Sequence, residues 1–384
     1  MPDRVYLDWN ATTPLRPEAR QAMAAAWEVA GNPSSVHAEG RQARRLVEDA
    51  RAAISVAVGA RSQDVVFTSA GTEANALALT PGLRRGAGEP VRRLLVSAIE
   101  HTSVLSGGRF SPEAMGTIKV NGSGLIDIGH LRRLLAVAPP TLVSLMLAYN
   151  ETGALQPVGE VADIVHEAGG LLHVDAIQAL GKIPFDIKLM KADLVTLSAH
   201  KIGGPKGVGA LVLAEDVQGL VPLLRGGGQE LGRRAGTENV AGIAAFGAAV
   251  RAAMAALQAD AARPQSLRDR LEAGLKQTPD MIVFSEGVPR LPNTTLFTVP
   301  GLRAETAVIG FDLGGIAVSS GSACSSGKVQ PSHVLAAMGV GRELAQGAVR
   351  LSLGWSTSEA DIDLALEAWR KLADALLKGR RNTA

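Results

Sequence analysis

The only cysteine of the chain, Cys324, lies in the segment SSGSACSSG (319–327), among five serines and two glycines. A buried structural cysteine normally has apolar neighbours and packs as a small hydrophobic side chain. Serine and glycine instead give a segment conformational freedom at little steric cost. We therefore interpret Cys324 as a thiol that moves and reacts. The reactive form is the thiolate, and because a free cysteine has a pKa of ~8.5, some feature of the site must favour that form.

Two further side chains follow the ends of apolar, β-branched runs. Asp175 follows GGLLHV (169–174), where a buried carboxylate needs a cationic or hydrogen-bonded partner. Lys201 follows ADLVTLS (192–198) and precedes a glycine-rich turn. Because ligands of open parallel sheets bind beyond the carboxyl ends of the strands, both side chains are expected at one crevice. A desolvated lysine there suits Schiff-base chemistry, although a solvated loop lysine is commoner and Lys206 is a rival.

The segment SAGTEANALAL follows the run DVVFT (64–68) and places a glycine turn at the start of a predicted helix. Free backbone N–H groups and the helix dipole at Gly71, Thr72 and Glu73 favour an anion. An N-cap role explains Thr72 equally well, and dipole compensation explains Glu73. An anion site, a strand-end acid and a strand-end lysine on one sheet are the three features that pyridoxal phosphate requires for its phosphate, ring nitrogen and aldehyde.

A metal site has little support in this sequence. The histidines considered for it are His37, His101, His166, His173, His200 and His333. They show neither the HxxxH nor the HxH spacing of zinc sites, and we interpret His173 as a core or supporting residue beside Asp175. One cysteine excludes an internal disulfide and a multi-thiolate metal site, and it suits the reducing cytoplasm.

Composition excludes several classes of function. The formal net charge is +2, and the arginines are scattered rather than gathered in a basic stripe, so we predict no direct nucleic-acid binding. The N-terminal residues MPDRVYLDWN contain no apolar run, and we predict no signal peptide. The most apolar segment, 240–257, carries Arg251 near its middle. We interpret it as a core-packed helix rather than a membrane span.

Short apolar strands alternate with helical patterns in the middle of the chain, which is typical of a parallel sheet covered on both faces. The predicted strands lie at 64–68, 92–98, 140–148, 169–176, 192–198 and 209–214. We therefore predict an α/β large domain over 16–258 with a mostly parallel central sheet. The pattern changes near residue 259, and residues 1–15 and 259–384 are predicted to form a smaller α+β domain that carries a mobile cysteine loop at about 319–331.

Ordered motifs run through nearly the whole chain, from residue 6 to about 357. They are YLDWNATTP, GNPSSVH (31–37), SAGTEAN (69–75), EH (100–101), YNETG (149–153), HVDAIQALGK (173–182), SAHKIGGPKGVG (198–209), RRAGTEN (233–239), SSGSACSSG and RLSLG (350–354). Together they resemble the cysteine desulfurases, pyridoxal-phosphate enzymes with the type I fold of class-V aminotransferases. The segment SSGSACSSGKVQPSHVL resembles the long-loop group, whose members supply sulfur to iron–sulfur scaffolds.

The resemblance implies a role for each matched residue around the cofactor ring. Lys201 would form the Schiff base with pyridoxal phosphate, and Asp175 would pair with the ring nitrogen. Gln178 would bond the ring hydroxyl. His101 would stack on the ring and shuttle protons during catalysis.

The phosphate of the cofactor would be held at a second group of matched positions. Gly71, Thr72, Ser198 and His200 would bind it within one subunit. Thr237 would reach it from the other subunit, which implies a homodimer with shared sites.

The substrate would bind beside these groups. Arg350 and Asn150 would grip the substrate carboxylate, for which a guanidinium fork is suited, and Asn150 would also border the cofactor. Asn32 would face the substrate. Trp9 departs from the family, which commonly has a smaller or tyrosine-like residue there, and we expect it to alter packing rather than chemistry.

The resemblance implies conversion of L-cysteine to L-alanine. Lys201 would take the Cα proton, and Cys324 would carry the sulfur as a persulfide to an acceptor such as an iron–sulfur scaffold or a tRNA-thiolation enzyme. Three alternatives remain open at this point: an aminotransferase for a small amino acid, which would not need Cys324, a selenocysteine lyase, and a sulfur-relay partner with a damaged cofactor site.

Overall fold

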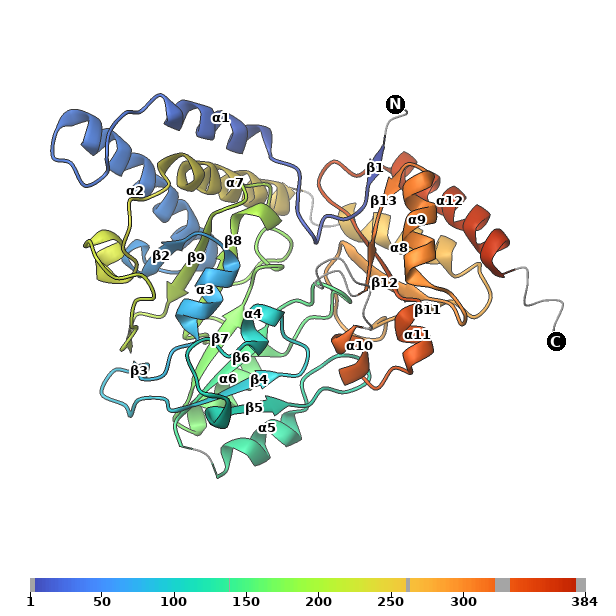
Figure 1. Cartoon of the computed structure of the whole chain (residues 1–384), viewed down its shortest axis with the longest axis horizontal. Coiled ribbons are helices and arrows are strands. Elements are labelled where there is room, and N and C mark those ends of the chain that lie inside the picture. The colour runs from blue at the N-terminus through green and yellow to red at the C-terminus, as the bar shows by residue number, and fades with distance from the viewer. Residues whose placement is uncertain (1–3, 138, 260–262, 322–331, 378–384) are drawn as a thin grey trace.

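The computed structural model of the chain describes residues 4–137, 139–259, 263–321 and 332–377. Figure 1 shows a larger part built around a twisted sheet and a smaller part formed mainly by the last third of the chain. The N-terminal strand lies among the C-terminal elements, so both ends of the sequence contribute to the smaller part.

A seven-stranded sheet forms the centre of the larger part. Its strands in spatial order are β2 (Val65–Thr68), β9 (Gly209–Leu213), β8 (Leu194–Ser198), β7 (Leu171–Asp175), β6 (Thr141–Met146), β4 (Arg93–Ser97) and β5 (Met115–Ile118). Strands β8, β7, β6, β4 and β5 run parallel, whereas β9 is antiparallel to both neighbours. The predicted mostly parallel sheet is therefore confirmed. The sequence did not predict β5, an edge strand with one buried residue among four.

Alternate residues of the strands enter two different hydrophobic cores, one on each face of the sheet. Val65 and Phe67 pack into the core that includes helices α2 and α7, whereas Val66 packs into the core that includes α3. The helices of this part are α1 (Pro17–Trp27), α2 (Ala38–Val58), α3 (Gly71–Ala78), α4 (Thr102–Leu105), α5 (Ile128–Leu135), α6 (Val158–Glu167) and α7 (Val240–Ala259). This two-sided cover leaves the strand ends free to form a site.

Among the described residues, one helix, α7, is long and apolar enough to cross a membrane. The most apolar part, Val240–Leu257, is 61% buried inside the protein. Figure 1 shows α7 beside α1 and α2, above the central sheet. This packing agrees with the prediction of a core helix.

The smaller part contains a four-stranded antiparallel sheet in the order β11–β12–β15–β14. Its strands are β11 (Ile282–Val283), β12 (Thr294–Thr298), β15 (Val349–Ser352) and β14 (Ser319–Ser320). Its helices are α8 (Arg263–Leu275), α9 (Ala304–Leu313), α10 (His333–Ala337), α11 (Arg342–Gln346) and α12 (Glu359–Leu377). Trp369 of α12 packs edge-on against Phe297 of β12 at a centroid distance of 5.0 Å, which fixes the helix on the sheet.

Two short pairs of strands join distant parts of the chain. Strand β1 (Val5–Tyr6) runs parallel to β13 (Ile316–Ala317), and β3 (Arg84–Arg85) is antiparallel to β10 (Val217–Gln218). The first pair attaches the N-terminal segment to the smaller part before the chain enters α1. The division at residues 258 and 259 and the assignment of residues 1–15 stay predictions.

Candidate active site

A cavity of about 280 Å³ lies at the carboxyl ends of the central strands and is bordered by the N-terminal segment and by β15. It gathers residues that are far apart in the sequence. The predicted site residues that line it are Gly71, Thr72, His101, Asn150, Asp175, Gln178, Ser198, His200, Lys201 and Arg350. We call it the cofactor cavity.

Asp175 ends β7 and is 2% exposed. Its Oδ2 atom accepts a hydrogen bond from Asn75 Nδ2 at 2.9 Å, and its Oδ1 atom accepts one from the backbone N–H of Ile177 at 3.0 Å. Burial raises the pKa of Asp175, and these two hydrogen bonds oppose the rise. The carboxylate is thus fixed by neutral donors, so a cation that entered the cavity would be favoured beside it.

His101 caps α4 with its side chain. Its Nδ1 atom accepts from the backbone N–H of Ser103 at 3.2 Å and lies 2.8 Å from the Ser103 hydroxyl oxygen. Because Nδ1 is an acceptor, the neutral imidazole carries its proton on Nε2. Burial lowers the pKa of His101, although Asp175 opposes this, so the neutral form is favoured near pH 7.

Lys201 lies in the 3₁₀ turn η3 (Ala199–Lys201), directly after β8. Its Nζ atom donates to the backbone oxygens of Asn10 and Ala11, both at 2.7 Å. The N-terminal segment therefore positions this amine at the cavity wall. Lys206, the alternative lysine, is absent from the described lining of the cofactor cavity.

Another part of the cavity wall is built from the start of α3 and from Ser198 and His200. Gly71 and Thr72 begin α3, whose first N–H groups have no intrahelical acceptor. Burial lowers the pKa of His200 to about 4, with smaller effects from nearby lysines, so its imidazole is neutral at pH 7. The helix start lies against β9 so closely that a Cβ on Gly209 would be 2.5 Å from the Ala70 carbonyl carbon. This glycine lets the anion-binding end approach the sheet.

Arg350 is a buried cation at the side of the cavity formed by β15, with a side chain that is 2% exposed. Its Nη1 atom donates to the backbone oxygen of Asn150 at 3.0 Å, and its Nη2 atom donates to Asp8 Oδ1 at 2.7 Å. Its buried Nε atom has no hydrogen-bond partner among the described residues. A ligand carboxylate would supply the missing acceptor.

Gln178 and Lys182 form a buried polar network with the N-terminal segment. Gln178 Nε2 donates to the Asn10 backbone oxygen at 2.9 Å. Lys182 Nζ donates to Asn10 Oδ1 at 2.8 Å and to Gln178 Oε1 at 2.5 Å. Each end of the Gln178 amide thus makes one hydrogen bond, and the second N–H of Nε2 remains for the predicted bond to a ring hydroxyl.

These residues fit pyridoxal phosphate. The cavity offers a carboxylate without a cationic hydrogen-bond partner at Asp175, an amine at Lys201, and a helix start beside Ser198. The orphaned Nε of Arg350 remains for a substrate carboxylate. Within the described ranges, no cluster of three or more His, Cys, Asp or Glu side chains could hold a metal ion.

Three predicted site residues are not brought into this cavity. Thr237 is exposed and lines a separate hollow beside Arg234. Asn32 is exposed in the connection between α1 and α2. Cys324 lies outside the described residues. Their roles stay predictions.

The described residues on either side of the cysteine segment contact the wall of the cofactor cavity. Ser319 of β14 is paired with Arg350 of β15. Ser332, which caps α10, donates to Glu151 Oε2 at 2.6 Å. Burial raises the pKa of Glu151 to about 7. Ser319 and Ser332 thus contact Arg350 of the cavity wall and Glu151, which follows Asn150 in the chain.

The sequence analysis missed several residues that support the site. Asn75 bonds Asp175, and Ser103 orients His101. Asp8 pairs with Arg350, and Asn10 accepts hydrogen bonds from Lys182 and Lys201. Asn75 was detectable, because it lies one helical turn after Gly71 and Thr72 and so faces the same sheet. Ser103 lies only two residues after His101, whereas the contacts of Asp8 and Asn10 cross long sequence separations and leave no local signal.

Comparison with known proteins places the chain among well-defined relatives. A family model described as Aminotransferase class-V matches residues 5–365. A protein named cysteine desulfurase from Cereibacter sphaeroides is 45% identical over 382 residues, which cover 97% of each chain. A cysteine desulfurase IscS from Dictyoglomus turgidum is 38% identical over 382 residues, 98% of this chain and 96% of the relative.

Solved structures give the same result. A NifS-like protein from Rickettsia africae superposes with a TM-score of 0.88 at 38% identity, covering 97% of this chain and 99% of that one. A structure described as SspA in complex with cysteine has a TM-score of 0.74 at 28% identity and covers 91% of this chain and 98% of that one.

Proposed function

We propose a reaction for this chain, which belongs to the class-V aminotransferase family and, within it, to the pyridoxal-phosphate-dependent cysteine desulfurases. In this reaction the protein removes sulfur from L-cysteine as a persulfide on Cys324 and releases L-alanine. The observation that carries this proposal is one cavity that unites Lys201, Asp175 and Arg350. A lysine, an acid and a carboxylate-binding arginine are what an amino-acid substrate and this cofactor require.

Each residue of the cavity would have a separate role in the reaction. Pyridoxal phosphate, when bound, supplies an electron sink that stabilises negative charge at the substrate Cα. Asp175 would keep the ring nitrogen protonated, and Arg350 would orient the substrate through its carboxylate. Lys201 would accept the Cα proton. His101 would offer the proton on Nε2 to the reacting groups.

Sulfur transfer balances without an external oxidant. The Cys324 thiolate attacks the substrate sulfur, so an S–S bond forms while the Cβ–S bond of L-cysteine breaks. The electron pair of the broken bond stays with Cβ, which takes up a proton and becomes the methyl group of L-alanine. The transferred sulfur is oxidised to the sulfane level as the carbon is reduced. Cys324 ends as a persulfide.

Mass spectrometry tests this step directly. Holoenzyme exposed briefly to L-cysteine should gain one sulfur on the peptide that contains Cys324, and it should release alanine. Cys324→Ala should bind the cofactor, shown by visible absorbance, but release no alanine. Alanine production by that variant at the wild-type rate, or dependence on a keto acid, would instead indicate a mechanism without the thiol, such as transamination.

We further propose a homodimer in which Thr237 completes the partner's phosphate site. The exposed position of Thr237 outside its own cofactor cavity supports this arrangement. Mixing Lys201→Ala and Thr237→Asp subunits provides the test. If Thr237 acts across the interface, each hybrid contains one intact site and regains activity. If it acts within its own subunit, no hybrid site is intact and activity stays absent.

The acceptor of the sulfur and the compartment are the last parts of the proposal. We propose a protein acceptor such as an iron–sulfur scaffold, because the cysteine segment resembles the long-loop group, and a cytoplasmic location, because a reactive single thiol suits a reducing compartment. Transfer of labelled sulfur from Cys324 to a purified scaffold protein would test the acceptor. Localisation of a tagged chain in cells would test the compartment.

A further inference from the structure

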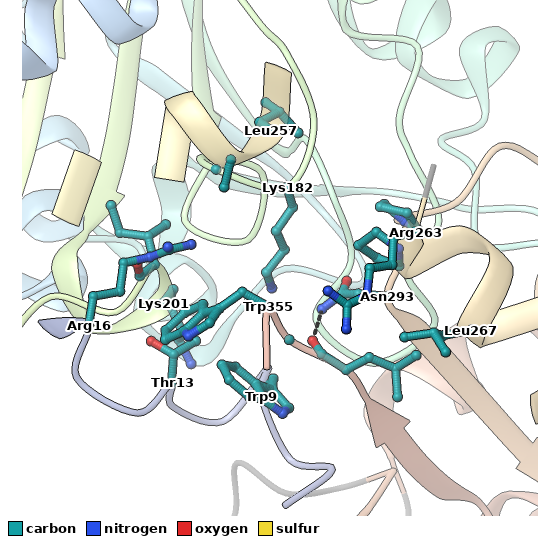
Figure 2. Close-up of a pocket in the computed structure, with 17 residues that line it drawn as sticks. Trp9, Thr13, Arg16, Lys182, Lys201, Leu257, Arg263, Leu267, Asn293 and Trp355 are labelled. Atoms are coloured by element: carbon teal, nitrogen blue, oxygen red, sulfur yellow. Dashed lines mark hydrogen bonds between the residues drawn. The ribbon is translucent and has the colours of Figure 1, made fainter. Parts of the chain in front are cut away.

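A second cavity, of about 170 Å³, lies between the two parts of the molecule. The N-terminal segment, the end of α7, the start of α8 and the residues after β15 supply its walls (Figure 2). We call it the interdomain cavity. Of its lining residues, Lys201 alone also lines the cofactor cavity. The two cavities are thus separate spaces on either side of one lysine.

The lining of the interdomain cavity is positively charged. It contains Arg16, Lys182, Lys201 and Arg263, and its described residues include no aspartate or glutamate. Figure 2 shows Arg16 and Arg263 on opposite sides, with Lys182 between them. Arg16 is the buried cation of this wall: it is 9% exposed, and its Nε atom donates to the backbone oxygen of Ile202 at 3.0 Å. Within the described ranges it forms no ion pair, so an anion in the cavity would be a favourable partner for it.

Lys182 is a second basic group of this wall. Its Nζ atom donates to Asn10 Oδ1 and Gln178 Oε1, which are neutral amide oxygens. Burial lowers the pKa of Lys182 well below its ordinary value, and the nearby charges of Lys201 and Arg350 lower it further. A negative charge in the interdomain cavity would oppose the effect of these nearby cations and favour the protonated amine.

The remaining walls of the cavity are flat and apolar. The rings of Trp9 and Trp355 meet edge to face at a centroid distance of 4.6 Å, and the Arg16 guanidinium lies 4.0 Å from the Trp355 ring centre. Two glycines permit this packing. A Cβ on Gly354 would be 2.0 Å from the Trp9 ring, and a Cβ on Gly203 would be 2.4 Å from Arg16 Cγ. Leucines and prolines from α7, α8 and the loop before β12 complete the surface.

We propose that the interdomain cavity is a binding site for a small carboxylate whose body is a single flat, apolar ring. Its volume slightly exceeds the ~150 Å³ of an apolar cavity that accommodates benzene, so a ligand built on one substituted ring suits it. The carboxylate would lie among the cations, with Arg16 as its main partner because a guanidinium matches carboxylate geometry. The ring would contact the tryptophans and leucines.

Calorimetric titration of the holoenzyme with 4-iodobenzoate tests this proposal, with the neutral isostere 4-iodobenzamide as the paired ligand. We expect saturable binding of the benzoate and at least ~10-fold weaker binding of the benzamide, the loss expected when one charged hydrogen bond is removed. Arg16→Gln should weaken benzoate binding about 10-fold. Arg20→Gln is the matched control, because Arg20 lies one turn further along α1 and is exposed.

Crystals of the complex distinguish the two cavities, because Arg350 could also hold a carboxylate. The anomalous signal of iodine should appear in the interdomain cavity, at the end of the ring that points away from Arg16. Iodine found only in the cofactor cavity, equal affinity for the two ligands, or equal weakening by Arg16→Gln and Arg20→Gln would each overturn the proposal. If Arg16→Gln does not fold, Arg263→Gln replaces it, since its side chain lies on the opposite wall.

Discussion

Replacement of Arg350 by lysine tests the substrate end of the cofactor cavity. The guanidinium donates to Asn150 and Asp8 through its two Nη atoms, which leaves the buried Nε atom for a ligand. Lysine keeps the charge but loses this third, fixed donor. One hydrogen bond to a charged group contributes ~1.5–3 kcal/mol. The variant should therefore lose roughly 10- to 150-fold in kcat/KM for L-cysteine, at about 1.4 kcal/mol per tenfold.

The loss should lie mainly in KM. The substrate carboxylate is present in both the ground state and the transition state, so removing its partner weakens both equally. Alanine release at varied L-cysteine concentrations gives KM and kcat separately. L-Cysteine methyl ester has no negative carboxylate to bind, so with this substrate the variant and the wild type should agree within about threefold.

Arg342→Lys is the matched control, because Arg342 is an exposed arginine on α11 near the same sheet. It should leave both constants unchanged. The reasoning is refuted if Arg350→Lys lowers kcat while KM stays constant, or if the methyl ester loses as much as L-cysteine. Either result would mean that Arg350 acts on the reacting groups or on the fold rather than on the carboxylate.

Three other predictions concern stability. Burial raises the folded-state pKa of Glu151 to about 7, so the stability that the protonated carboxyl contributes is present below pH ~4.5 and is lost as the pH rises towards 7. Glutamine stays neutral at every pH. In urea titrations, the free energy of unfolding of Glu151→Gln should therefore exceed that of the wild type by ~3 kcal/mol at pH 8 but not at pH 4. The buried ion pair of Arg51 with Glu230, at 2.7 and 2.8 Å, should make Glu230→Gln less stable by ~3–5 kcal/mol in the same assay, and a loss under 1 kcal/mol would contradict it. Gly354→Ala places a methyl carbon 2.0 Å from the Trp9 ring, so the free energy of unfolding of this variant should fall by ~1–3 kcal/mol and its melting temperature should fall with it. An unchanged melting temperature would contradict the packing.

The strands of the central sheet could be predicted because each is a short buried run with its own local signal. Each of the six predicted ranges contains an observed strand. Periodicity carries no information about strand direction, however, and the antiparallel orientation of β9 follows from its hairpin-like return after η3. The pairing of β1 with β13 joins residues that are more than 300 positions apart. Such a contact depends on the packing of the whole chain.

The chemistry-bearing residues were predictable for a similar reason. Asp175 and Lys201 each follow a strand, and the topology of parallel sheets brings strand ends together. The supporting residues were not predictable, because Asn10 and Asp8 belong to a segment with no secondary-structure signal. The structure is needed to show that this N-terminal segment crosses the site. There Asn10 accepts hydrogen bonds from Lys182 and Lys201, and Asp8 accepts one from Arg350.

The position of the N-terminal segment across the site affects the order in which the protein folds. The backbone N–H of Asn10 donates to Ser352 Oγ at 2.9 Å, across 342 positions of sequence, and its side chain reaches Thr294. Asn10 can therefore take its final place only after Ser352 has been synthesised. Because contacts between distant segments form late, the large sheet can assemble during translation. The backbone acceptors of the Lys201 amine are therefore fixed only after β15 has been synthesised.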